Sequence, residues 1–153
     1  MAQQENYSGK KKRHTVKNLI LINAALTILF LSPTYEGRLH DKRMAEATPY
    51  PLPEGSRLLQ DLGFLAFAIE GVEVIMPTKK PKGKQLTPEQ KAENRRISSR
   101  RVRIEHVISS VKRCRIVKDI CRLLKPDARD RVMEIASALH NFRLRLYPWQ
   151  PMT

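Results

Sequence analysis

The stretch SSRRVRIEHVISSVKR, residues 98–113, carries the helix around which we expect the rest of the chain to be organised. Apolar residues recur there at helical spacing and predict one buried stripe; they are Ile97, Ile104, Ile108 and Val111. A single acid, Glu105, lies roughly 100° from Ile104 on a helical wheel, at the margin of that stripe. Glu105 can form a surface ion pair with Arg101, one turn earlier, or can bind a metal ion beside a phosphate-binding surface.

Basic side chains dominate the composition. The 29 Lys and Arg residues outnumber the 15 Asp and Glu residues and give a formal charge of +14. This imbalance favours a polyanionic partner, nucleic acid first and an anionic membrane surface second. The candidate phosphate contacts are Lys10, Lys11, Lys12, Arg13, Lys79, Lys80, Lys82, Lys84, Arg95, Arg96, Arg100, Arg101, Arg103, Lys112 and Arg113. Each cluster can also be an ordinary solvated surface.

The length of 153 residues suits one domain with a modest core. We expect a flexible tail at residues 1–9, a domain over residues 10–149 and a short tail at residues 150–153. Cys114 and Cys121 are too few for a disulfide framework and lack the spacing of a zinc site, so we interpret both as packing residues. The aliphatic segment 19–31 is too short and too polar to span a bilayer.

The first half of the chain predicts two buried strands followed by a short helix. Residues 15–22 and 27–32 are rich in aliphatic and β-branched residues, and residues 23–26 would connect them as a hairpin without the usual glycine. A single helix through residues 19–31 is the competing interpretation. Further on, Asp41 is placed to cap a helix over residues 42–47.

The middle of the chain places a second acid directly after a strand. Residues 56–60 predict a buried strand that leads into Asp61. An acid just after a strand of an open α/β sheet is a common catalytic residue. The alternative is a turn acid that is stabilised by the following Gly63. Residues 72–76 predict another strand, and the lysine-rich residues 78–85 a loop. Thr87 and Gln90 then fit a capping box at the start of the long helix.

The final segment predicts a second amphipathic helix. Its expected buried stripe consists of Val132, Ile135, Ala136, Leu139, Phe142 and Leu146. The complete order is strand, strand, short helix, strand with Asp61, strand, then a helix with Glu105. That order predicts an α/β fold with an RNase H-like mixed sheet that lacks its first strand and is followed by C-terminal helices.

Five segments carry a family resemblance: YSGKKKRHTVKNLILI, SPTYEGRLHDKR, LLQDLGF, LTPEQKAENRRISSRRVRIEHVISSVKR and ALHNFRL. Together, over residues 7–149, they resemble the C-terminal catalytic half of bacterial insertion-sequence transposases of the DDE superfamily, in its Harbinger-like endonuclease branch. The resemblance implies double-stranded DNA as partner, Mg²⁺ or Mn²⁺ as cofactor, and a nucleoid-associated protein of the bacterial cytoplasm without a membrane association.

The same resemblance assigns roles to three acids. It implies that Glu105 is the third catalytic acid and a metal ligand, and that Asp61 is the second catalytic acid and a metal ligand. Asp41 belongs to a His-Asp pair and is the alternative candidate for the second catalytic acid. Asp61 ranks above Asp41 because it follows a strand directly. The family's first acid would lie on a strand before YSGKKK, where this sequence starts, so we expect an N-terminally truncated chain that is inactive alone.

Two other functions stay open at this stage. The chain can be a basic DNA-binding protein without enzymatic activity, which the charge of +14 supports equally well. It can also be a regulatory partner of a full-length transposase or of a second copy of itself.

Overall fold

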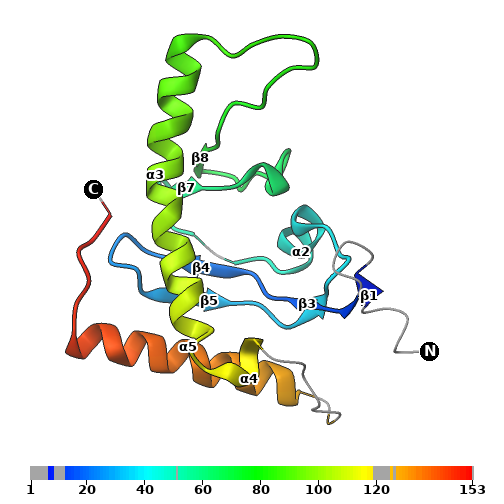
Figure 1. Cartoon of the computed structure of the whole chain (residues 1–153), viewed down its shortest axis with the longest axis vertical. Helices are drawn as coiled ribbons and strands as arrows, with labels where there is room; N and C mark the ends of the chain where they lie inside the picture. Colours follow the sequence, from blue (N-terminus) through cyan, green and yellow to red (C-terminus); the bar gives the residue numbers. More distant parts are fainter. Residues whose placement is uncertain (1–6, 9–12, 51, 119–124, 126, 153) are drawn as a thin grey trace. The chain divides into compact units, whose positions relative to one another are not determined.

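The computed structural model describes residues 7–8, 13–50, 52–118, 125 and 127–152. It divides into two compact units, which we name by their strand pairing. The hairpin unit consists of Met1–Arg38 and Arg101–Thr153, and the parallel unit is Leu39–Arg100. Helix α3 (Pro88–Val111) belongs to both units (Figure 1). The content of short sheets and helices confirms the mixed α/β class.

Antiparallel pairs make up the sheets of the hairpin unit. The three pairs are β1 (Tyr7–Ser8) with β2 (Arg13–His14), β3 (Val16–Lys17) with β6 (Tyr35–Glu36), and β4 (Ile20–Ile22) with β5 (Ile28–Leu31). The hairpin prediction is therefore confirmed, and a helix through residues 19–31 is wrong. Between β3 and β4, the side-chain amide of Asn18 donates to the Ser32 carbonyl at 3.1 Å and to Thr34 Oγ1 at 3.0 Å.

Asn23 and Leu26 form the hairpin turn without a glycine. Leu26 is fully buried and has a φ of 67°, in the left-handed region that few residues with a side chain adopt. Its N–H donates to the Asn23 carbonyl at 2.9 Å, and the Asn23 side chain accepts from Thr27 N at 3.0 Å. Asparagine makes this turn possible because its side chain supplies a local acceptor for the backbone.

Two polar residues of helix α5 (Ala128–Leu146) hold this hairpin. The buried ring of His140 shares a hydrogen bond of 3.0 Å with the Leu26 carbonyl. The side chain of Asn141 accepts from Ile28 N and donates to the Ile28 carbonyl, both at 2.9 Å. Asn141 thus satisfies the two backbone groups of a strand residue as a neighbouring strand would.

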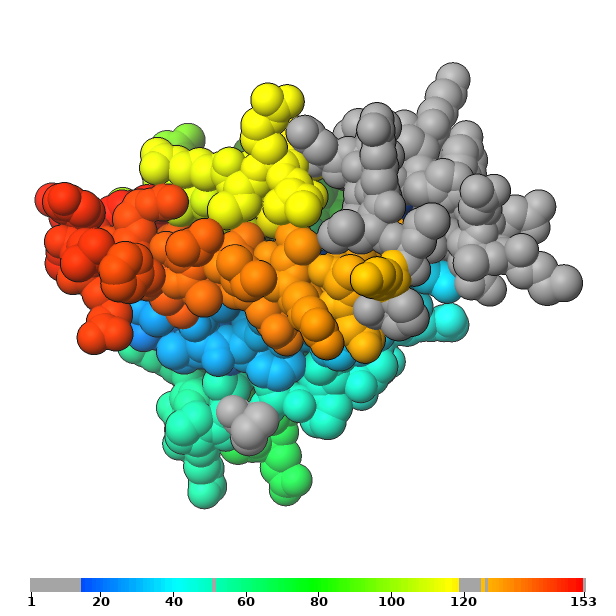
Figure 2. Space-filling model, turned by 90° about the horizontal axis from the view of Figure 1, so that it is seen from below, coloured from blue at the N-terminus to red at the C-terminus, as the bar shows by residue number. Residues whose placement is uncertain are grey.

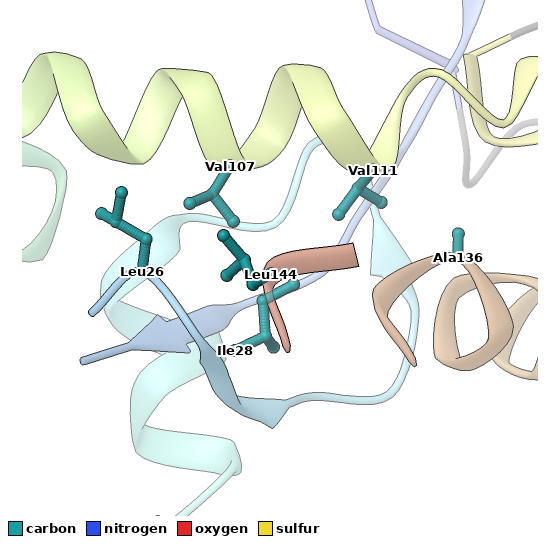
Figure 3. Packing of buried hydrophobic residues seen from close by; sticks show 6 residues of the cluster. All are labelled: Leu26, Ile28, Val107, Val111, Ala136 and Leu144. Carbon is teal, nitrogen blue, oxygen red and sulfur yellow. The ribbon is translucent and has the colours of Figure 1, made fainter. Parts of the chain in front are cut away.

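The core of the hairpin unit lies between α3, α5 and the hairpin. Figure 3 shows its buried members, which are Leu26, Ile28, Val107, Val111, Ala136 and Leu144. The predicted stripe on α3 is correct at Ile97 and Val111, whereas Ile104 and Ile108 are only half-buried and Val107 is fully buried. Because Val107 and Val111 are one turn apart, the inward face lies closer to Val107 than the sequence pattern indicated.

The predicted stripe on α5 is wrong for most of its members. Of its six residues only Ala136 is buried, and Ile135, Leu139, Phe142 and Leu146 are 62%, 47%, 59% and 58% exposed. The inward side instead carries Ser137, His140 and Leu144. The helix is turned this way because His140 and Asn141 must face the hairpin backbone. The outer side of α5 lies uncovered across the face seen in Figure 2.

The parallel unit contains α2 (Asp41–Ala47), β7 (Arg57–Leu59), the 3₁₀ turn η1 (Leu62–Phe64), β8 (Glu73–Ile75) and the first half of α3. Strands β7 and β8 pair in parallel, as the two predicted strands allow. The capping box is confirmed: Thr87 N donates to Gln90 Oε1 at 3.0 Å, and Gln90 N donates to Thr87 Oγ1 at 3.2 Å. Met44, Leu58 and Ile97 are among its buried residues.

The remaining predictions about packing and membranes have mixed outcomes. Cys114 lies half-buried against the core of the hairpin unit, near helix α4 (Arg115–Lys118), which confirms its packing role; Cys121 is outside the described residues. No helix in the described ranges is long and apolar enough to cross a bilayer. The described strands pair two by two, so the RNase H-like mixed sheet stays a prediction.

The two faces of α5 predict opposite responses to truncation. Leu144→Ala removes a side chain that is 8% exposed and should lower the free energy of unfolding by about 2–4 kcal/mol. Leu139→Ala removes a side chain that is 47% exposed and should cost less than about 1 kcal/mol. Urea denaturation followed by circular dichroism measures both, and equal losses of stability would contradict the observed orientation of the helix.

Candidate functional site

Asp61 lies where the sequence predicts it, at the end of strand β7. Its backbone is extended, and its Oδ1 accepts a hydrogen bond of 2.6 Å from Leu62 N, so the side chain caps η1. The carboxylate is exposed to solvent. The capping role of a turn acid is therefore present.

Asp41 does not cap α2, contrary to the sequence prediction. The cap is His40, which has φ −71° and ψ 140° and whose Nδ1 accepts from Lys42 N at 3.3 Å. The chain is already helical at Asp41, so the cap falls one residue earlier. Asp41 lies instead in the first turn, where its charge is favourable beside the helix N-terminus.

Asp41 is brought to the turn that Asp61 begins. A Cβ atom built on Gly63 would lie 2.7 Å from Asp41 Oδ2, closer than such atoms approach one another. Gly63 thus leaves the space that the Asp41 carboxylate occupies, two residues after Asp61. The sequence indicated Gly63 only as part of a turn, and no spacing rule connects it with an acid 22 positions earlier.

Glu105 is an exposed residue of α3 in the hairpin unit. It lies away from the inward face, which carries Val107 and Val111. Asp41 and Asp61 belong to the parallel unit, so the convergence of Glu105 with them stays a prediction.

The predicted phosphate contacts differ in exposure. In the parallel unit, Lys79, Lys80, Lys82, Lys84, Arg95 and Arg96 are exposed, and Arg100 is half-buried. In the hairpin unit, Lys112 and Arg113 are exposed, and Arg101 and Arg103 are half-buried. Arg13 lies in β2, and Lys10, Lys11 and Lys12 are outside the described residues. Asn94 holds the start of the lysine loop, residues 78–85. Its side chain accepts from Thr78 N at 2.7 Å and donates to the Thr78 carbonyl at 2.9 Å.

The donor types of the candidate site fit a hard divalent cation. Asp41, Asp61 and Glu105 offer carboxylate oxygens, which Mg²⁺ and Mn²⁺ prefer. Within the described ranges, no group of three or more His, Cys, Asp or Glu side chains is assembled to hold a metal ion. A metal-binding role for these acids therefore stays a prediction.

Comparison with known proteins identifies the class. A family model described as DDE superfamily endonuclease matches residues 1–141, and the chain belongs to this family. A probable transposase for insertion sequence element IS702 from Microchaete diplosiphon is 32% identical over 111 residues, which cover 69% of this chain and 38% of that relative. The chain thus spans about two fifths of the length of that relative. No solved structure matches the chain.

The close approach of Asp41 to Gly63 predicts a coupling that a double-mutant cycle can measure. Gly63→Ala should lower the free energy of unfolding by about 1 kcal/mol, because the new methyl group displaces the Asp41 carboxylate. On an Asp41→Ala background the same change should cost markedly less, since the displaced group is gone. Additive effects in urea denaturation would show that the two residues do not meet.

Proposed function

We propose that this chain is part of a metal-dependent transposase that cleaves DNA and transfers its strands. In this proposal the two units belong to an RNase H-like domain in which Asp61 and Glu105 bind Mg²⁺ and Asp41 supports Asp61. Membership of the DDE superfamily of endonucleases is the observation that carries the proposal. The sequence identity to an insertion-sequence transposase supports the choice of reaction.

The local geometry supports roles for the two acids of the parallel unit. Asp61 is held at the end of β7 by its own capping hydrogen bond, which fixes the direction of the carboxylate. The Asp41 carboxylate lies against Gly63 in the same turn and adds negative charge beside it. Two carboxylates near this turn, one from α2 and one from the residue that begins the turn, raise its affinity for a cation. A bound Mg²⁺ would supply activation of a water or 3′-hydroxyl and stabilisation of the leaving oxygen.

The cations support DNA as the substrate. The exposed lysines of the loop at residues 78–85 and the exposed Arg95 and Arg96 of α3 are long, charged side chains that can reach phosphates. Such contacts release counterions and bind without reading sequence. We propose that these residues position duplex DNA, and that a full-length transposase or a second copy of the chain is a further partner.

A binding role without cleavage is the second candidate. It is favoured by the formal charge of +14, which supports DNA binding equally well without cleavage. A nicking assay on supercoiled DNA with Mg²⁺ or Mn²⁺ separates the two functions. Nicking that Glu105→Gln abolishes supports the enzyme and contradicts the expectation that the chain is inactive alone. Without nicking, weaker Mn²⁺ binding by the acid variants below distinguishes an inactive part of an enzyme from a protein that only binds DNA.

Metal binding by the proposed acids can be measured directly. We expect Mn²⁺, titrated against the chain and followed by its electron paramagnetic resonance signal, to bind about tenfold more weakly to Asp61→Asn and to Glu105→Gln, because each change removes a charged ligand. Asn can still cap η1, so Asp61→Asn keeps the local fold. Glu93→Gln is the matched control, since Glu93 is also an exposed acid of α3. Unchanged binding by Glu105→Gln would remove Glu105 from the ligand set.

Salt dependence tests the lysine loop. Replacing Lys79 and Lys80 together with Gln should weaken binding to duplex DNA equally for different sequences. It should also reduce the slope of log affinity against log salt by about two, because each lysine that neutralises a phosphate contributes about one. Lys42→Gln is a suitable control, because the Lys42 ammonium lies 3.4 Å from the Glu46 carboxylate on α2. A slope that stays the same in the double variant would show that the loop does not touch phosphate.

A further inference from the structure

The hairpin unit has a surface hollow of about 420 Å³. Of its lining residues, only Arg103 is among the site residues that the sequence predicts. It is lined by Arg103 and His106 of α3 and by Trp149 and Gln150, which follow α5. Arg103 and His106 are three positions apart and therefore share one side of the helix. The hollow is wide open to solvent, so a ligand in it would be covered on one side only.

The wall that Trp149 and Gln150 provide is fixed to the rest of the unit. Met152 N donates to the Ala24 carbonyl at 2.8 Å, and Arg103 donates from its guanidinium to the Gln150 carbonyl. The Trp149 ring packs against the core and meets the ring of His140 at an interplanar angle of 74°, with centroids 5.6 Å apart. His140 in turn is buried and bound to the Leu26 carbonyl. The hollow is therefore set by the same contacts that hold the hairpin.

The chemistry of the lining suits a base and a phosphate together. A half-buried indole ring offers a surface on which a nucleobase can stack. The guanidinium of Arg103 and the exposed imidazole of His106 offer N–H donors for phosphate oxygens. Arg103 Nε has no hydrogen-bond partner within the described ranges, so the protein satisfies this guanidinium only in part.

We propose that this hollow binds one unpaired nucleotide of the DNA substrate, with its base on Trp149 and its phosphate at Arg103 and His106. The proposal rests on the proposed function in taking DNA as the substrate. The nucleotide must be unpaired, because a base within a duplex is stacked on its neighbours and cannot lie against an aromatic ring. Glu105, the proposed metal ligand, directly precedes His106 on α3. The bound nucleotide would therefore contact α3 within one helical turn of Glu105.

Intrinsic fluorescence reports on the hollow, because Trp149 is the single tryptophan of the chain. We expect a short single-stranded oligonucleotide to quench this emission and to bind about tenfold more tightly than an abasic oligonucleotide of the same length, which has the phosphates without the bases. A blunt duplex should bind through the exposed cations and leave the emission unchanged. Equal affinity for normal and abasic strands, or emission unchanged by the single strand, would overturn the proposal.

Variants assign the effect to the lining. With labelled oligonucleotides and anisotropy detection, Trp149→Ala should abolish the preference for the normal over the abasic strand, and Trp149→Phe should keep it, because a ring remains. Arg103→Gln should weaken both single strands. Lys80→Gln is the control and should weaken normal, abasic and duplex DNA alike. Persistence of the preference in Trp149→Ala would overturn the proposed site, whereas a complete lack of duplex binding by the unaltered chain would instead contradict the proposed function.

Discussion

The hydrogen bonds from His140 and Asn141 to the hairpin are the constraint on which the hairpin unit depends. They satisfy the backbone of Leu26 and Ile28 at a turn that lacks glycine and has a left-handed leucine. An unpaired buried carbonyl or N–H costs about 1–3 kcal/mol, so the inward face of α5 is fixed by polar residues. Leu144 and Ala136 then pack on the core because they share that face.

This constraint leaves an apolar face of α5 in contact with solvent. Leu139 and Phe142 are about half exposed although they have the spacing of a buried stripe. A helix with two apolar sides can bury either one, and hydrophobic area alone does not choose between them. The specific hydrogen bonds decide, since turning the helix would leave the hairpin backbone without partners.

The candidate site shows how a single side chain can hold a turn and orient a carboxylate at once. Asp61 begins a turn and holds it with a capping bond, and the same bond orients its carboxylate. Gly63 lacks a side chain, and the Asp41 carboxylate occupies the space that a methyl group would fill. The missing side chain of Gly63 thus lets a carboxylate of α2 approach this turn. By contrast, the cations around Glu105 are spread along α3 and do not share one turn.

The sequence by itself determined the elements whose signals are local. The strands at the hairpin, the capping box of Thr87 and Gln90 and the position of Asp61 after β7 all follow from neighbouring residues. Tertiary structure alone decided which face of α5 is buried, that Val107 is fully buried on α3, and that Asp41 lies against Gly63. It also placed Trp149 beside Arg103. These contacts join residues that are far apart in the chain. The orientation of α5 is set by hairpin backbone groups that need hydrogen-bond partners, and a periodic pattern of side chains contains no information about such groups.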